Sequence, residues 1–224
     1  MADDNPITKR EIAVTWFTET AKEIPVLRSL VGTYESVFNK IESNRVRIVL
    51  EDVIRRLGRV EDYLKDEQKV RTLIYGCDQA RGDILFEEKA DAYGSVTSGL
   101  IVVEPDLNKV VEILDALRKL SGTDLKVLNH FWIGGKVWPN RQVEEIAGCQ
   151  RGINPFPDVA GLRGKMEKLF PSLMRLQGLG ILFVSPGHDR SGETPLDIGG
   201  LASYLKQFAF LTEVGTRLVA VLPH

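Results

Sequence analysis

Residues 44–64, NRVRIVLEDVIRRLGRVEDYL, constrain the fold of this chain more than any other stretch. Their apolar residues recur at alternating steps of four and three, the spacing that keeps one stripe of a helix against a partner. Most positions in between are charged, so the pattern separates a buried side from a solvated side. The sequence therefore predicts a long heptad helix whose seam consists of Val46, Leu50, Val53, Leu57, Val60 and Leu64.

This seam can close on the protein's own helices or on a second copy of the chain. An isolated long seam favours a partner, and two-fold dimers are the commonest oligomers. We therefore expect self-association as a homodimer through the helical part. The apolar seam that precedes this stretch loses phase around residues 42–45, which indicates either a break between helices or a stutter in one long helix. Gly32 and Gly58 each cost about 1 kcal/mol relative to alanine in a helix interior and weigh against the continuous helix.

The rest of the first 132 residues has the apolar periodicity of helices joined by short connections. Asp66 is placed to begin one helix, Gly82-Asp83 marks a turn, and Ser121 or Thr123 can cap a short helix containing Leu125 and Leu128. Short connections make neighbouring helices antiparallel. We expect residues 1–132 to form a helical bundle domain and the glycine- and proline-rich residues 133–158 to form a hinge or wrapping loop with one short helix.

The last segment, residues 159–224, has a different order of elements. Helices are expected at 159–169 and, opened by Pro171, at 171–179. Short apolar runs at 181–184 and 207–211 predict strands on either side of a loop, and Thr212 is placed to cap a final helix. The fold class expected for the whole chain is mainly α, with a small α+β domain at this end.

This order of elements resembles that of winged-helix domains. The resemblance is carried by LMRLQGLGILFV at 173–184 and FAFLTEVGTRLVAVL at 208–222, the second of which is similar to the ending of many bacterial winged-helix regulators. It implies that the helix at 171–179 is the recognition helix of a winged-helix-like domain. The candidate DNA-binding residues are then Arg163, Lys165, Lys168, Arg175 and Arg190.

The supply of positive charge is small for a DNA-binding protein. Residues 151–190 carry six Lys and Arg residues against three Asp and Glu residues, and the whole chain has a formal net charge of -2. Phosphate contacts supply most non-specific DNA affinity, and binders usually make several of them. The alternative is that these charges keep a small domain in solution while it binds protein.

A second resemblance lies in the helical part. The segment RLGRVEDYLKDEQKVRTLIYGCDQARGDILFEEKADAYGSVTSGL at 56–100 is similar to a pattern in bacterial phage-resistance (Abi-alpha-like) helical proteins. In those proteins a coiled helix is followed by a helix pair and a winged-helix-like end. The resemblance implies a scaffold or sensor role in a defence or stress system, and it brings no catalytic residues with it.

Enzyme motifs are missing from the sequence. It contains no GxGxxG, GxxxxGK[ST] or GxSxG motif. The three histidines are scattered: His130 is expected to pack among aromatic residues, and His188 to lie in a solvated loop. The adjacent acids Glu51-Asp52 and Glu87-Glu88 diverge by about 100° on a helix, which favours solvated faces over a shared-proton pair. We expect no enzyme activity, no catalytic residues, no cofactor and no metal.

Cys77 and Cys149 are far apart and form no CxxC pair, which favours two buried thiols in a reducing cytoplasm. No stretch approaches the roughly 20 apolar residues that span a bilayer, and the N-terminus has no apolar signal core. The expectation is a soluble cytoplasmic, non-catalytic interaction or scaffold protein whose protein partner the sequence does not name. The alternative is a winged-helix DNA-binding transcription regulator.

Overall fold

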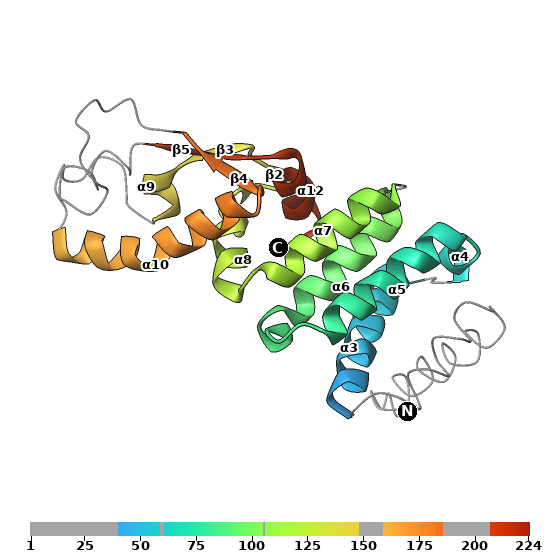
Figure 1. Ribbon diagram of the computed structural model, residues 1–224. Helices are drawn as coiled ribbons and strands as arrows, with labels where there is room; N and C mark the ends of the chain where they lie inside the picture. The colour runs from blue at the N-terminus through green and yellow to red at the C-terminus, as the bar shows by residue number, and fades with distance from the viewer. Residues whose placement is uncertain (1–39, 59–60, 105, 148–158, 186–206) are drawn as a thin grey trace, which may run out of the picture. The chain divides into compact units, whose positions relative to one another are not determined.

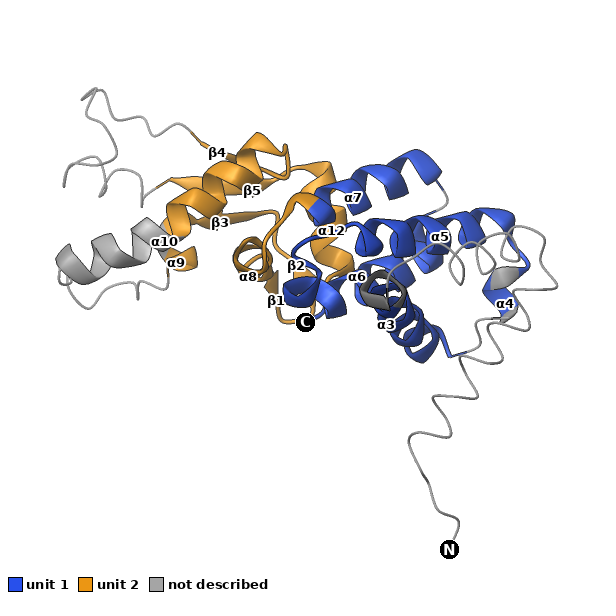
Figure 2. Cartoon of the chain, turned by 60° about the horizontal axis from the view of Figure 1, so that its bottom comes forward, with its two compact units in different colours: residues 1–118, 223 blue, residues 119–222, 224 orange. Residues whose placement is uncertain are grey.

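The computed structural model describes residues 40–58, 61–104, 106–147, 159–185 and 207–224 (Figure 1). Within these ranges it describes only the backbone at residues 40–43, 61, 64, 144 and 159–168. The chain separates into two compact units: unit 1 contains residues 1–118 and Pro223, and unit 2 contains residues 119–222 and His224 (Figure 2). The boundary precedes the helix around Leu125, which the sequence pattern places in the first domain.

Unit 1 is built from helices. They are α3 (Lys40–Leu57), α4 (Glu61–Leu64), α5 (Glu67–Arg81), α6 (Phe86–Val103) and α7 (Leu107–Lys119), of which α7 crosses the boundary by one residue. α3, α5 and α6 pack against one another. Asp66 begins α5 as predicted, because its carboxylate accepts hydrogen bonds from the backbone N–H groups of Gln68 and Lys69.

The prediction of one helix through residue 64 is wrong, because α3 ends at Leu57. Gly58 has a φ of 69°, a left-handed conformation that favours glycine, and its N–H donates to the carbonyl of Ile54 at 3.0 Å. This is the hydrogen bond of a helix C-terminus that ends in a left-handed residue. The glycine therefore stops the helix even though the apolar spacing continues beyond it.

The predicted seam is partly buried inside unit 1. Val46 and Val53 are buried, Leu50 and Leu57 are half-buried, and the side chains of Val60 and Leu64 lie outside the described residues. Val49, which is not a seam residue, is fully buried. Because the chain's own α5 and α6 cover this side of α3, the described part of the seam is not isolated and gives no reason to require a partner.

The central helix α6 owes its close packing to small residues. A Cβ atom added to Gly94 would overlap the Asp52 side chain of α3, and one added to Gly76 of α5 would overlap Thr97 of α6. Glycine at these two positions lets the helix backbones approach each other. Tyr93, on the neighbouring position, is fully buried.

Unit 2 begins with α8 (Gly122–Asn129), which starts at a capping box formed by Ser121 and Asp124. The hairpin of β1 (Trp132–Ile133) and β2 (Lys136–Val137) follows. Gly134 and Gly135 form its turn with φ values of 58° and 77°, as a two-residue hairpin turn of type I′ requires.

An antiparallel sheet of three strands follows, in the order β3–β5–β4. Its strands are β3 (Asn140–Gln142), β4 (Leu182–Val184) and β5 (Phe208–Leu211). Cα partners include Phe183 with Phe210 and Arg141 with Ala209. β4 and β5 agree with the strands expected from the sequence, whereas β3, which precedes the short helix α9 (Val143–Ile146), was not expected.

α10 (Val159–Gly178) is one helix where the sequence pattern predicts two. Pro171 lies inside it and cannot donate the helical hydrogen bond to the carbonyl four residues earlier, yet the helix continues and buries Leu173 and Leu176. The final helix α12 (Glu213–Val221) is capped by the Thr212 hydroxyl, which accepts from the N–H of Gly215 as predicted.

The described chain is thus mainly α, with small antiparallel strands near its C-terminal end, and this part of the prediction is confirmed. Among the residues that the structure describes, no helix is both long and apolar enough to cross a membrane.

Candidate functional site

Three phenylalanines share one exposed side of the sheet in unit 2. Phe183 of β4 and Phe208 and Phe210 of β5 are 50%, 38% and 38% exposed, whereas the alternating Leu182 and Ala209 are buried. Successive side chains of a strand point to opposite faces, so these three lie on the same side of the sheet. We call Phe183, Phe208 and Phe210 the phenylalanine face.

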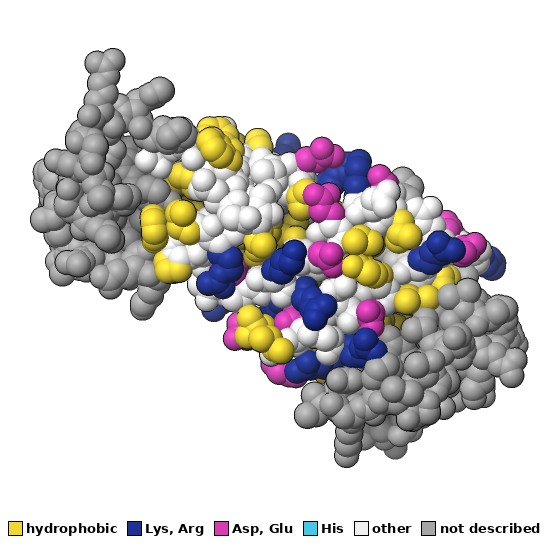
Figure 3. Space-filling view, in the orientation of Figure 1, with side chains coloured by type: hydrophobic (Ala, Val, Ile, Leu, Met, Phe, Trp, Pro, Cys, Tyr) yellow, Lys and Arg dark blue, Asp and Glu magenta, His cyan; other side chains and the backbone are white. Residues whose placement is uncertain are grey.

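The three residues of the phenylalanine face are neighbours on the sheet. Phe183 and Phe210 are direct cross-strand partners, and the ring centroids of Phe208 and Phe210 are 6.1 Å apart with a tilt of 39°. Figure 3 shows hydrophobic side chains in yellow at the surface of unit 2. Exposed aromatic residues that touch one another, unlike scattered apolar residues, mark interaction sites.

The same side of the sheet carries no charge in its three strands. Asn140 and Gln142 of β3 are the Cα partners of Phe210 and Phe208, so they complete this side with amide groups. The single charged residue of the three strands is Arg141, and its partner is the buried Ala209. Arg141 therefore belongs to the other side, where it pairs with Glu145 at 2.9 Å and donates to the carbonyl of His130 at 2.8 Å.

Arg175 has a structural partner within unit 2. Its Nη1 lies 3.1 Å from Oδ2 of Asp124, whose side chain is fully buried. The same Oδ2 accepts from the N–H and the hydroxyl of Ser121 in the cap of α8. The guanidinium thus compensates a buried carboxylate and ties α10 to the start of α8, which is a reason for an arginine at this position that does not involve DNA.

The other candidate DNA-binding residues are not brought together by the described atoms. Arg163, Lys165 and Lys168 lie on the N-terminal half of α10, where only the helix backbone is described. Arg190 lies outside the described residues, and so does His188.

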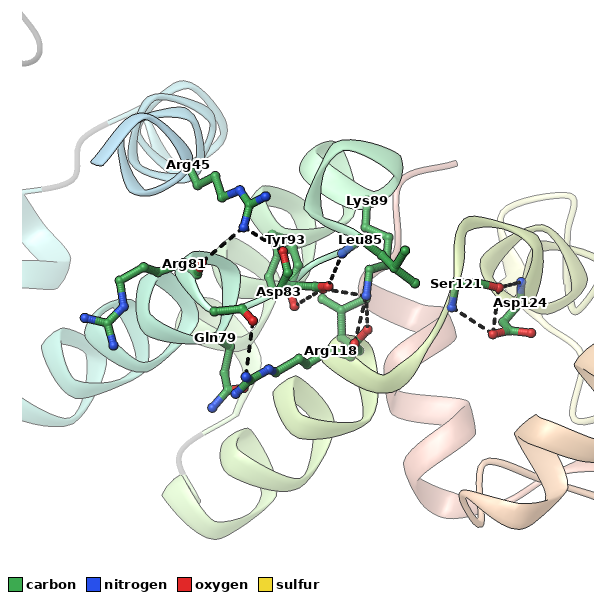
Figure 4. A network of polar contacts seen from close by, with 12 residues as sticks. Arg45, Gln79, Arg81, Asp83, Leu85, Lys89, Tyr93, Arg118, Ser121 and Asp124 are labelled. Atoms are coloured by element: carbon green, nitrogen blue, oxygen red, sulfur yellow. Dashed lines mark hydrogen bonds and ion pairs between the residues drawn. The ribbon is translucent and has the colours of Figure 1, made fainter. Parts of the chain in front are cut away.

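Unit 1 contains a buried polar network that sequence reasoning did not find (Figure 4). The Lys89 side chain is fully buried, and its Nζ lies 2.5 Å from Oδ2 of Asp83 and donates to the carbonyls of Leu117 and Arg118 at 2.9 and 3.0 Å. Tyr93 donates its hydroxyl to the same Oδ2 of Asp83 at 2.6 Å. Lys89 is the only lysine among the buried side chains of the described residues.

This network stabilises a turn and a helix end. Oδ1 of Asp83 accepts from the N–H of Leu85 at 2.7 Å, which holds the turn between α5 and α6. The two carbonyls that bind Lys89 are at the C-terminal end of α7, where helix carbonyls lack partners within the helix. Arg45 of α3 adds a hydrogen bond of 2.8 Å to the carbonyl of Asp83. Lys89, Asp83 and Tyr93 are thus paired with one another inside unit 1, and the arrangement is structural.

Burial favours the neutral forms of Tyr93 and Cys77 in unit 1. Burial is the main cause that raises the pKa of Tyr93, and the hydrogen bond to Asp83 is the second. Burial raises the pKa of the Cys77 thiol to about 12, so this thiol is an unreactive core residue, as predicted. Cys149 lies outside the described residues.

His130 in unit 2 does not pack among aromatic residues as expected. Its side chain is exposed at the C-terminal end of α8. Partial burial of the imidazole is the main cause that lowers its pKa, and the positive charge of the neighbouring Arg141 lowers it further. Of the acids singled out in the sequence, Glu51 pairs with Arg47, Asp52 with Arg56 and Glu87 with Arg45.

Within the described residues, no group of three or more His, Cys, Asp or Glu side chains is placed to hold a metal ion. Comparisons of the chain with protein-family models, with curated proteins and with solved structures find no match.

Proposed function

We propose that the protein is a non-catalytic interaction protein that binds another protein chain through the phenylalanine face of unit 2. The observation that supports this is that three exposed phenylalanines lie on one side of a sheet whose strands place no charge there: Phe208 and Phe210 are in ring contact, and Phe183 is the cross-strand neighbour of Phe210. The centres of protein–protein interfaces are enriched in aromatic residues and depleted of charged ones. The paired network around Lys89 supports the complementary role of unit 1 as a rigid scaffold.

The test is site-specific photo-crosslinking in the native host. Benzoylphenylalanine, which is close in shape to phenylalanine, replaces Phe210 in the full chain, and Met174 on α10, which is 46% exposed, serves as the control position. We expect a defined covalent adduct from position 210, its loss when Phe183→Thr is added, and no such adduct from position 174. Equal adduct patterns from both positions would refute the proposal.

A role in a phage-defence or stress-response system belongs to the same proposal. It rests on the resemblance of residues 56–100 to Abi-alpha-like proteins. A cytoplasmic location is a separate part of the proposal and rests on the two distant cysteines, Cys77 and Cys149, which suit a reducing compartment. Self-association through the helical part also stays a prediction. Identification of a phage product or of another defence protein in the adduct would support the first of these.

The second candidate function is nucleic-acid binding by a winged-helix domain. The order α8, β3, α9, α10, β4, β5 together with the strand order β3–β5–β4 resembles that of winged-helix domains. α10 would then be the recognition helix. A fold of this kind serves many functions, so its presence alone does not assign one.

Fluorescence anisotropy with a random DNA duplex at low salt tests this candidate. The salt dependence is the slope of the logarithm of the binding constant against the logarithm of the salt concentration. If the domain binds DNA, replacing Arg163, Lys165 and Lys168 by alanine reduces this slope by about one for each phosphate that the variant no longer neutralises. Because Arg175 compensates Asp124, we expect Arg175→Ala to lower stability by about 1–3 kcal/mol instead of changing sequence preference. Absence of binding at low salt removes this candidate.

A further inference from the structure

We infer that the occupant of the phenylalanine face is a second copy of this chain, whose own phenylalanine face packs against the first in a weak two-fold dimer. This inference rests on the proposed function and specifies the partner. It follows from the charge, the arrangement and the area of the face.

The charge of the face permits self-association. A two-fold interface brings the same surface patch of both copies together, so any charge near the axis meets its own like charge, which is destabilising. The described strands place no charged side chain on this side, because Arg141 is on the opposite one. Nucleic acid is a poor occupant for the same reason: the strands offer its phosphates no cation on this side.

The arrangement of the face is self-complementary. Phe183 and Phe210 are adjacent across the strands, and Phe208 adjoins Phe210, so a rotated copy offers aromatic rings to aromatic rings. Asn140, the exposed partner of Phe210 on β3, borders the rings with a side chain that both donates and accepts hydrogen bonds. Such an amide can satisfy the same amide from another copy, and face-to-face packing of two sheets is a common arrangement.

The area of the face sets the strength of the dimer. A phenylalanine has a surface of about 200 Å², so the three exposed fractions amount to about 250 Å² for each copy. A standard stable interface buries about 800 Å² on each partner. The dimer is therefore weak and forms only as the protein concentration rises, whereas a permanent dimer would need a larger surface elsewhere.

Sedimentation velocity of the purified full chain, from low micromolar to near-millimolar concentration, tests this inference. We expect a concentration-dependent shift from monomer to dimer, and an association at least about tenfold weaker in the Phe183→Thr/Phe210→Thr variant. Threonine keeps a high strand propensity, and circular dichroism checks that the variant is folded. The Phe183→Tyr/Phe210→Tyr variant retains the rings and should retain the dimer, as should the control Met174→Gln.

Photo-crosslinking of the purified protein with benzoylphenylalanine at position 210 supplies a measurement that does not depend on the threonine variant. The inference expects an adduct of twice the chain mass that joins position 210 to β4 or β5 of the other copy. It is overturned if the chain stays monomeric at all concentrations, if the dimer persists in the threonine variant, or if position 210 links only to its own chain. A monomer that still yields a Phe183-dependent adduct with a different protein in the host overturns this inference and leaves the proposed function intact.

Discussion

Replacing Lys89 by methionine should destabilise unit 1 strongly although the two side chains have similar volume. The substitution removes a fully buried ammonium and leaves the Asp83 carboxylate, 2% exposed, without its cation. Removing one partner of a buried ion pair costs about 3–5 kcal/mol. Asp83 keeps the donors of Tyr93 and Leu85 at 2.6 and 2.7 Å, so we expect the lower end, about 3 kcal/mol.

Thermal and urea unfolding followed by far-UV circular dichroism measures this loss. For a chain of this size, about 3 kcal/mol corresponds to a decrease of roughly 6–12 °C in the melting temperature of the unit that contains Lys89. The matched control is Lys69→Met on α5. Lys69 is 36% exposed and pairs with Asp66 at 4.0 Å, and such a surface pair contributes about 0–1 kcal/mol.

A double-mutant cycle tests whether the pair itself is responsible. Asp83→Asn should also destabilise, because it leaves the buried Lys89 ammonium without the negative charge that lies 2.5 Å from its Nζ. The double variant removes both charges, so its cost should fall below the sum of the single costs by about 2 kcal/mol or more. A loss under about 1 kcal/mol for Lys89→Met, or additive effects in the double variant, would show that the buried pair does not stabilise the fold in this way.

Two further predictions concern unit 1 and its helix packing. Gly94→Ala places a methyl group on the Asp52 side chain of α3 and should lower the free energy of urea unfolding by about 1–3 kcal/mol. The control Gly178→Ala, whose added Cβ meets nothing within 4 Å, should leave stability unchanged or raise it by up to about 1 kcal/mol. Equal effects of the two substitutions would contradict the close packing at Gly94. Burial and the hydrogen bond to Asp115 raise the pKa of Tyr75 to about 12, above its value of about 10 in the unfolded chain. Tyr75 therefore keeps its proton to a higher pH in the folded state than in the unfolded chain. The stability that it contributes is present below about pH 10 and is lost as the pH rises toward about 12. Absorbance titration at 295 nm that shows every tyrosine ionising near pH 10 in the folded protein would contradict this.

Local chemistry accounts for the elements that were predicted correctly from the sequence. Asp66 and Thr212 cap their helices because a short polar side chain reaches the free N–H groups of the first turn. The strand runs at 182–184 and 208–211 were recognisable because β-branched and aromatic residues favour extended backbone. These signals lie within a few residues of one another, so a sequence contains them directly.

Signals that depend on distant residues were missed. The runs ILFV and FAFL are apolar at almost every position, so their sequence indicates a strand without indicating which face is covered. The exposed phenylalanines emerge only when β5 pairs with β4 on one side and β3 on the other. In the same way, the local sequence does not indicate that Lys89 and Asp83 are buried; the fold brings them together with the end of α7.

By itself the sequence determined three things: the chain is mainly helical, several helices begin at recognisable caps, and a small β element follows the helical part. It could do so because capping and periodicity act over one or two turns. Only the tertiary structure decided that Gly58 ends α3, that the buried stripe is covered by the chain's own helices, that Arg175 compensates Asp124, and that three phenylalanines face outward together. The physical reason is that burial and charge pairing belong to neighbours in space, and such neighbours can be far apart in the chain: Arg175 and Asp124 are separated by 51 positions.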